Sequence, residues 1–238
     1  MKRKRLNAIA SLILVLILIL AAAGQVRAQG SPISYPEMAP IDEYLMADRN
    51  AEIALARSAA PEAISRDAKI LVLGRHGYET AIEGKNGFVC VVERAWMSPF
   101  DRPEFWNPKI RGPICFNPPA AHSILPLTYK RTQMILAGKS KAQIIDAFKA
   151  AYEKKELPAL EAGAMSYMMS KEAYLTDADD HNVAHLMFYN PLMGGAAWGA
   201  DLPNSPVRLT PQFKDAPPID VFIVPVGRWS DGAPAPVM

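Results

Sequence analysis

The amino-acid sequence predicts an α+β fold: a mostly antiparallel sheet with a helical hairpin packed on one face, and one disulfide. Strand-like runs fall into two groups, before residue 94 and after residue 163, and helix-like runs lie between them at 120–157. This grouping differs from the regular strand–helix alternation that builds a doubly wound parallel sheet. Two cysteines, Cys90 and Cys115, supply the predicted disulfide.

The first half of the chain is expected to contain one helix at 42–57 and three strands at 70–73, 78–83 and 88–93. Apolar residues recur at helical spacing in the first range and fill the strand-like runs. The last two strands are expected to form a hairpin, because the Asn86-Gly87 pair between them is a strong hairpin signal. The Pro- and aromatic-rich stretch at 95–119 is expected to be a loop.

Helices open the second half. Residues 120–137 are expected to be mostly helical, with Pro126 interrupting or restarting the helix and Gly138 ending it. Ser140 and Gln143 have the spacing of a capping box, so a second helix is expected to begin there and to end before Pro158. Three further strands are expected at 164–169, 185–189 and 219–226.

Residues 1–28 have the three parts of a secretory signal peptide. A basic head at 2–5 precedes an apolar stretch at 8–23, and Ala28 offers a small residue for cleavage. That stretch has about 16 residues, whereas a membrane-spanning helix needs roughly 20, so cleavage is favoured over a retained anchor. The sequence therefore predicts a periplasmic or secreted protein, with a flexible lead-in at 29–40 and a single globular domain at 41–238.

The charge balance depends on this cleavage. The whole chain has a formal net charge of +2, with 26 basic and 24 acidic residues. Residues 1–28 hold five basic residues and no acidic one, so the remainder carries 21 basic and 24 acidic residues, a net charge of −3. Neither a basic stripe nor a basic amphipathic helix follows, so nucleic acid is not an expected partner and no stable membrane span is expected after cleavage.

Both cysteines lie in the expected mature chain. In an oxidising compartment an isolated pair is most simply a disulfide. A Cys90–Cys115 bond would close a loop of about 26 residues, a constraint that stabilises by roughly 3.5 kcal/mol in the chain-entropy model. Because Cys90 lies in an apolar strand-like run, an inert structural bond is favoured over a reactive thiol.

Arg75-His76-Gly77 follows a short apolar strand and resembles the nucleophile signature of the histidine phosphatase superfamily. The resemblance implies that His76 attacks phosphorus and that Arg75 holds the phosphate. The family also needs a second histidine late in the chain, for which only His181 and His185 are candidates. A polar turn between two strands is the alternative interpretation of the same three residues.

His181 and His185 form a second candidate site. On a helix, histidines four residues apart can bind one metal ion, and the carboxylates of 177–180 would orient or complete the site. In a strand the two residues would lie about 13 Å apart, too far to share one ion. The alternative is a solvated acidic loop followed by one half-buried histidine.

The segment between the cysteines is rich in aromatic residues and proline. Its candidate binding residues are Trp96, Phe100, Arg102, Phe105 and Trp106. Aromatic side chains on a stiff loop can line a ligand groove or anchor a protein partner. They can equally fold back and cap the hydrophobic core.

Several stretches of the chain, at 73–79 with 86–90, at 112–118, at 184–189 and at 229–232, together resemble a group of exported bacterial proteins without an assigned activity. The resemblance implies export and a shared fold. No catalytic set emerges from the sequence, so we expect no cofactor and a non-enzymatic role, binding a small ligand or protein partner outside the cytoplasm. The alternatives are a phosphate-ester hydrolase centred on His76 and a metal-handling protein that uses His181 and His185.

Overall fold

The structure is a computed structural model that describes residues 35–178, 183–211 and 217–236. The predicted signal segment, 1–28, lies outside the described residues. The strands are β1 (Lys69–Gly74), β2 (Gly77–Ile82), β3 (Val89–Glu93), β4 (Gly112–Phe116), β5 (Met165–Met168), β6 (His185–Pro191), β7 (Arg208–Leu209) and β8 (Ile219–Pro225). The helices are η1 (Ile41–Glu43), α2 (Arg49–Arg57), α3 (Glu62–Ser65), η2 (Ala95–Met97), α4 (Pro118–Ser123), α5 (Leu125–Leu136), α6 (Lys141–Glu153) and η3 (Gly195–Trp198).

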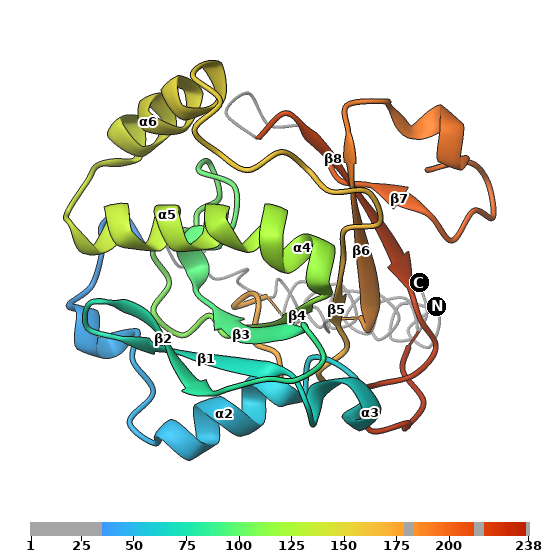
Figure 1. Cartoon of the computed structure of the whole chain (residues 1–238), viewed down its shortest axis with the longest axis horizontal. Coiled ribbons are helices and arrows are strands. Elements are labelled where there is room, and N and C mark those ends of the chain that lie inside the picture. The colour runs from blue at the N-terminus through green and yellow to red at the C-terminus, as the bar shows by residue number, and fades with distance from the viewer. Residues whose placement is uncertain (1–34, 179–182, 212–216, 237–238) are drawn as a thin grey trace, which may run out of the picture. The chain divides into compact units, whose positions relative to one another are not determined.

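The described strands form one eight-stranded sheet in the order β2-β1-β3-β4-β5-β6-β8-β7. Only the β1–β3 pair is parallel, and the other neighbours in this sheet are antiparallel. This architecture confirms the predicted α+β class and the mostly antiparallel sheet (Figure 1).

Helices cover both faces of the first half of the sheet. The predicted helical hairpin is α5 and α6, and α4 and α5 pack on one face, whereas α2 packs on β1, β3 and β4 from the other (Figure 1). Alternate residues of a strand point to opposite faces, so Cys90 and Val92 pack with α2 and Val91 packs with α4 and α5. Burial on both faces explains why β1 and β3 have near-continuous apolar sequences.

The boundaries of α5 and α6 follow their predicted signals, whereas the helix expected at 42–57 begins only at Arg49, where Asp48 caps α2. Pro126 lies in the first turn of α5, and the helix is interrupted at Ile124 between α4 and α5. Gly138 ends α5 with φ 71°, the left-handed conformation that glycine adopts most readily. Ser140 and Gln143 form the expected capping box at the start of α6.

The predicted hairpin at Asn86-Gly87 is wrong. β2 pairs with β1 through the two-residue turn Arg75-His76, and β3 runs parallel to β1. Gly87 does have a positive φ of 78°, but the Asn86 side chain donates to the Ile64 carbonyl at 2.8 Å. These contacts turn the chain toward the start of β1 and not back along β2.

The predicted loop at 95–119 contains a strand that the sequence pattern did not reveal. All five residues of β4 are buried, and β4 pairs with β3 along its whole length. Pro113 within the strand, and Pro108 and Pro118 on either side of it, made the segment look irregular. β4 is nevertheless a central strand, with β3 on one side and β5 on the other.

The predicted disulfide is present. Cys90 on β3 lies directly opposite Cys115 on β4, with an S–S distance of 2.01 Å, and both residues are fully buried. The bond therefore ties two neighbouring strands at the centre of the core. In the part of the chain that the structure describes, no helix has the length and apolar character needed to cross a membrane.

Candidate functional site

Arg75 and His76 occupy the exposed turn between β1 and β2, at one edge of the sheet. The Arg75 guanidinium pairs with the Asp42 carboxylate at 2.5 Å. His185 starts β6, and β3, β4 and β5 separate β6 from β1, which corresponds to roughly 19 Å at the usual spacing of strands. The structure therefore does not bring His76 and His185 together, and it places Arg75-His76 in a polar turn.

His185 is buried at the start of β6, and its Nδ1 atom lies 2.7 Å from the Val183 carbonyl oxygen. Burial lowers the pKa of this histidine, so its neutral form is favoured. His181 lies outside the described residues. Among the residues that the structure describes, no three His, Cys, Asp or Glu side chains are grouped closely enough to hold a metal ion.

Most of the predicted aromatic loop packs into the core. Trp96 and Phe105 are fully buried, and Trp106 is 8% exposed. Trp96 donates from Nε1 to the Thr132 hydroxyl at 3.1 Å, which fixes the loop to α5. These three side chains present little surface to a partner and occupy the positions expected of a core-capping loop. Phe100 is only partly buried, and Arg102 is exposed.

The chain ahead of α2 also packs against this loop. Tyr44 is fully buried, and its hydroxyl donates to the Trp106 carbonyl at 2.8 Å. Burial raises the pKa of Tyr44 to about 12, so the phenol stays protonated as a donor. Further upstream, Tyr35 donates to the Asp177 carboxylate. The described part of the predicted lead-in, 35–40, is thus attached to the core.

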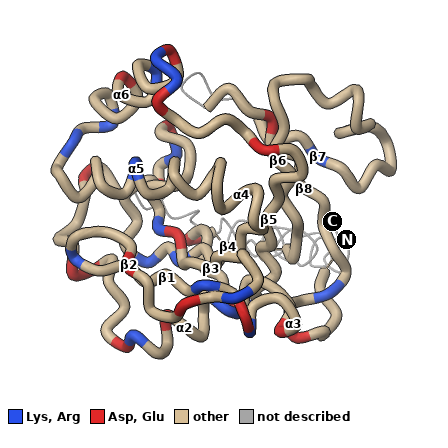
Figure 2. The backbone as a smooth tube through the Cα atoms, in the orientation of Figure 1, with Lys and Arg blue, Asp and Glu red and all other residues tan. Residues whose placement is uncertain are grey.

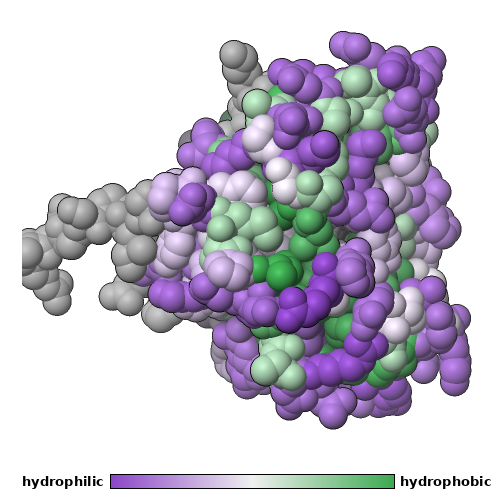
Figure 3. Space-filling model, turned by 90° about the vertical axis from the view of Figure 1, so that its left-hand side faces the viewer, coloured by the Kyte–Doolittle hydropathy of each residue, from purple (hydrophilic) through white to green (hydrophobic). Residues whose placement is uncertain are grey.

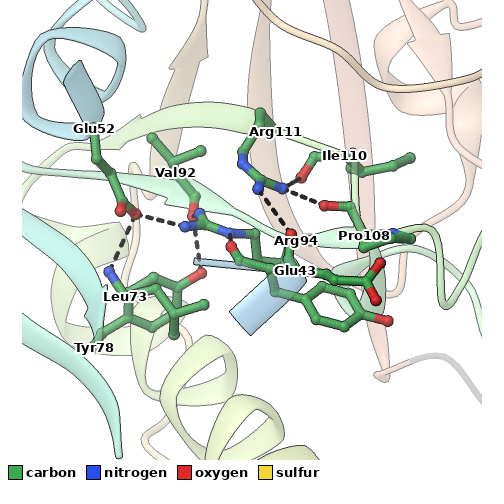
Figure 4. A network of polar contacts seen from close by, with 10 residues as sticks. Glu43, Glu52, Leu73, Tyr78, Val92, Arg94, Pro108, Ile110 and Arg111 are labelled. Carbon is green, nitrogen blue, oxygen red and sulfur yellow. Dashed lines mark hydrogen bonds and ion pairs between the residues drawn. The ribbon is translucent and has the colours of Figure 1, made fainter. Parts of the chain in front are cut away.

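A buried ion pair joins α2 to the sheet (Figure 4). Arg94 donates to Glu52 at 2.7 Å, and both side chains are almost fully excluded from water. Glu52 also accepts from the Leu73 amide at 3.1 Å, and Arg94 donates to the Val92 and Tyr44 carbonyls. Nearby Arg111 donates to two loop carbonyls at 2.6 and 2.8 Å. Both guanidiniums are bonded to the chain itself, which indicates a structural role.

Arg131 on α5 differs from Arg94 and Arg111 because part of its guanidinium group is buried without a hydrogen-bond partner among the described residues. One of its terminal nitrogens donates to the Ser98 carbonyl at 2.7 Å, and its guanidinium lies 3.9 Å from the centre of the Phe100 ring. Its Nε atom is buried and has no hydrogen-bond partner among the described residues. Burial lowers the pKa of Arg131 to about 9. The environment therefore disfavours the positive charge that this residue carries.

Lys141, the first residue of α6, adds a second cation. Its Nζ donates to the Phe100 carbonyl at 2.8 Å and lies 4.2 Å from the centre of the Phe105 ring. Burial, followed by repulsion from Arg131, lowers the pKa of Lys141, although the nearby Asp101 charge acts in the opposite direction. Within the described residues, no carboxylate oxygen lies within 4.0 Å of the charged nitrogens of Arg131 or Lys141. We call Phe100, Arg131 and Lys141 the Arg131 site.

Glu93, the last residue of β3, lies behind this site. Its side chain points to the α5 face, where the Thr128 hydroxyl donates to it at 2.9 Å. Burial raises the pKa of Glu93 to about 7, although the Thr128 hydrogen bond and the Arg131 charge act in the opposite direction. A carboxyl group that titrates near neutral pH, close to a poorly solvated cation, is typical of functional sites.

The Arg131 site combines charge with apolar surface. Figure 2 shows basic residues on α5 and at the start of α6. Figure 3 views the side of the molecule that carries α6 and the end of α5, and shows apolar side chains gathered in a hollow surrounded by hydrophilic ones. The partly buried apolar residues around this end of the core include Met97, Phe100, Met134 and Phe148. Such a mixture, mostly apolar with few polar groups, is common in ligand sites.

The sequence contains one signal for this site that the motif search missed. Leu125, Thr128, Thr132 and Ile135 form the buried face of α5, so polar residues lie on a core-facing surface. Polar residues on such a face need partners, and here they contact Glu93 and Trp96. Comparison with protein families, with curated proteins and with solved structures finds no match to this chain.

Proposed function

We propose that the protein binds a small organic anion at the Arg131 site, outside the cytoplasm, without catalysing a reaction. The location is supported by the signal-type N-terminus and by the buried Cys90–Cys115 bond, which suits an oxidising compartment. The binding role is supported by the geometry of the two cations.

The observation that carries the proposal is a pair of neighbouring cations, the desolvated Arg131 and the partly buried Lys141, that no carboxylate oxygen of the described residues contacts within 4.0 Å. Moving a charged group out of water is costly unless an opposite charge or enough hydrogen bonds replace the water. Arg94 meets this requirement through Glu52 and backbone carbonyls. Arg131 and Lys141 each donate one hydrogen bond to a carbonyl oxygen and contact aromatic rings. An anion would supply the missing charge and accept from their remaining N–H groups.

The surroundings favour an anion that also has an apolar body. Arg131 contacts the ring of Phe100, and Lys141 donates to the Phe100 carbonyl. Met97, Met134 and Phe148 are partly buried nearby. A fully hydrated inorganic anion would leave this apolar surface unused. A carboxylate attached to an aromatic or aliphatic group would place charge at the cations and carbon against the side chains.

Isothermal titration calorimetry with benzoate tests the proposal, and benzamide is the neutral probe of matched shape. We expect benzoate to bind, benzamide to bind at least tenfold more weakly, and added salt to weaken benzoate binding. Arg131→Gln should reduce the benzoate affinity at least tenfold, because it removes the buried positive charge.

Lys139→Gln is the matched control, because Lys139 is an exposed cation two residues before Lys141. This variant should bind benzoate as the wild type does. Equal affinity of the wild type for benzoate and benzamide, or the same loss of affinity in the Lys139 and Arg131 variants, would contradict an anion site at Arg131.

A further inference from the structure

We infer that the ligand of the Arg131 site is an elongated amphipathic carboxylate. Its charged end would lie at Arg131 and Lys141, its apolar chain beneath α6, and a neutral hydrogen-bond acceptor at its far end beside Tyr152. The inference rests on the proposed function and names the class of ligand. It depends on a line of side chains along α6 and on the unpaired hydroxyl of Tyr152.

Lys141, Phe148 and Tyr152 lie on one line along α6. Phe148 follows Lys141 by two helical turns, and Tyr152 follows Phe148 by one. The ring centroids of Phe148 and Tyr152 are 6.5 Å apart, so the two side chains are neighbours on this face. Phe148 packs against the core cluster that contains Phe105, and the Lys141 Nζ atom lies 4.2 Å from the centre of the Phe105 ring. The line therefore leads from a charged nitrogen, over apolar surface, to a phenol.

α6 is lightly packed against the rest of the protein. Its main neighbour among the described helices and strands is α5, and Figure 1 shows α6 standing apart from the sheet. Of its 13 residues, Ile144 and Ala151 are fully buried. The apolar hollow in Figure 3 lies on the side of the molecule that carries this helix. A hydrocarbon chain that enters beneath α6 would therefore leave the sheet undisturbed.

The hydroxyl of Tyr152 lies at the far end of the line. Its oxygen atom is buried and has no hydrogen-bond partner among the described residues. Burial raises the pKa of Tyr152 to about 12, so the phenol keeps its proton and can donate it. At the charged end, the Nε atom of Arg131 is also buried without a partner. Buried polar groups are nearly always hydrogen-bonded, and acceptor atoms at the two ends of one ligand would satisfy both donors.

The spacing of these groups sets the length and chemistry of the ligand. Tyr152 follows Lys141 by 11 positions, which corresponds to about 16 Å along the helix axis. An extended hydrocarbon chain advances about 1.3 Å per carbon, because its C–C bonds are about 1.5 Å long, so about twelve carbons span this distance. The acceptor at the far end should be neutral, because a second charge would be costly in buried surroundings.

Calorimetry with tridecanoate and 12-hydroxydodecanoate tests the inference, below the concentrations at which these acids form micelles. The two probes have the same charge and length and differ in a terminal methyl or hydroxyl group. We expect tridecanoate to bind at least tenfold more tightly than benzoate, because its chain buries more apolar surface. A purely apolar site would favour tridecanoate over the hydroxy acid. Beside Tyr152, we expect the hydroxy acid to bind at least as tightly.

Tyr152→Phe removes the phenolic donor and keeps the ring. The informative quantity is the affinity for 12-hydroxydodecanoate divided by that for tridecanoate, because a change in packing affects both probes. We expect this ratio to fall at least threefold in the variant. Tyr174→Phe is the matched control, because the Tyr174 hydroxyl donates to the Asp177 carboxylate and not to the proposed ligand. This control should keep the wild-type ratio.

Thermal melting provides a second measurement on the same variant. Tyr152→Phe should be at least as stable as the wild type, because the hydroxyl that it loses has no partner among the described residues. A clearly lower melting temperature would mean that the hydroxyl is already bonded within the protein, and this result would overturn the inference.

The binding outcomes separate the two proposals. Long-chain acids that lose affinity in Arg131→Gln, but keep the same ratio in the wild type and Tyr152→Phe, would overturn the inference and leave the anion site intact. Tridecanoate that binds no more tightly than benzoate would lead to the same conclusion. If the wild type binds none of the three acids, both the anion site and the named class of ligand are wrong.

Discussion

The guanidinium of Arg131 lies 3.9 Å from the centre of the Phe100 ring, and the same side chain donates to the Ser98 carbonyl. Arg131 of α5 thus contacts the loop that follows β3 at two points, the backbone of Ser98 and the aromatic ring of Phe100. Lys141 bonds the Phe100 carbonyl from the start of α6. The helical hairpin and the disulfide-bounded loop therefore meet through cations, and a ligand that binds there would contact both.

Glu93 should make stability depend on pH. Its pKa is about 7 in the folded protein and near 4.5 when exposed in the unfolded chain. Between those values the folded state holds a proton that the unfolded state releases, so the free energy of unfolding falls as the pH rises, by about 3 kcal/mol in total, and levels off above pH 7.

Urea unfolding at pH 5 and pH 8 checks this, with Glu93→Gln as the comparison. Other groups titrate over the same range, so the informative quantity is the stability of the wild type minus that of the variant. That difference should decrease from pH 5 to pH 8. A constant difference would mean that Glu93 is not desolvated.

Trp106→Ala should lower the free energy of unfolding by roughly 3–5 kcal/mol, because Trp106 is 8% exposed and packs edge-on against Phe105. Arg102→Ala in the same loop should change stability by less than about 0.5 kcal/mol, because that side chain is exposed. Thermal melting of the two variants measures both. Similar melting temperatures would mean that the loop does not cap the core.

Replacing both Cys90 and Cys115 with alanine should lower the free energy of unfolding by about 2–5 kcal/mol. The bond links neighbouring strands inside the core, so its loss removes a constraint on the unfolded chain and leaves two small gaps. Denaturant unfolding of this variant and of the oxidised wild type gives the difference. Thiols that label freely in the native wild-type protein would show that the bond is absent.

Glu52→Gln should be strongly destabilising, by about 3–5 kcal/mol, because it leaves the Arg94 guanidinium buried without its carboxylate. Combining Glu52→Leu with Arg94→Met removes both charges and should recover much of that loss. Denaturant unfolding of the single and double variants separates a desolvated charge from poor packing. A double variant less stable than Glu52→Gln would indicate that the backbone bonds of Arg94 matter more than its charge.

Local sequence signals predicted the boundaries of α5 and α6 well, because caps and breaks act over a few residues, but the helix expected at 42–57 starts only at Arg49. Pro126, Gly138 and the Ser140–Gln143 capping box each act where they were expected. Strand pairing depends on contacts between distant residues. Asn86 forms its side-chain bond with Ile64, a partner that no hairpin rule considers, and β3 therefore pairs in parallel with β1.

The candidate site was harder to predict than the fold. Glu93, Thr128 and Arg131 belong to no sequence motif and are spread over 39 positions. Their interaction depends on burial and on the packing of β3 against α5, which the sequence pattern does not reveal. The motif with a recognisable pattern, Arg75-His76-Gly77, lies in an exposed turn. Short motifs describe local chemistry, whereas this site forms only when β3, α5 and the loop between the cysteines pack together.

The attachment of the N-terminal segment bears on the order of folding. Tyr44 bonds the Trp106 carbonyl 62 residues later, and Tyr35 bonds Asp177 142 residues later. These early residues leave the ribosome well before their partners exist, and such long-range contacts form slowly. The segment that is synthesised first must therefore wait until most of the chain has emerged before it can take its native position.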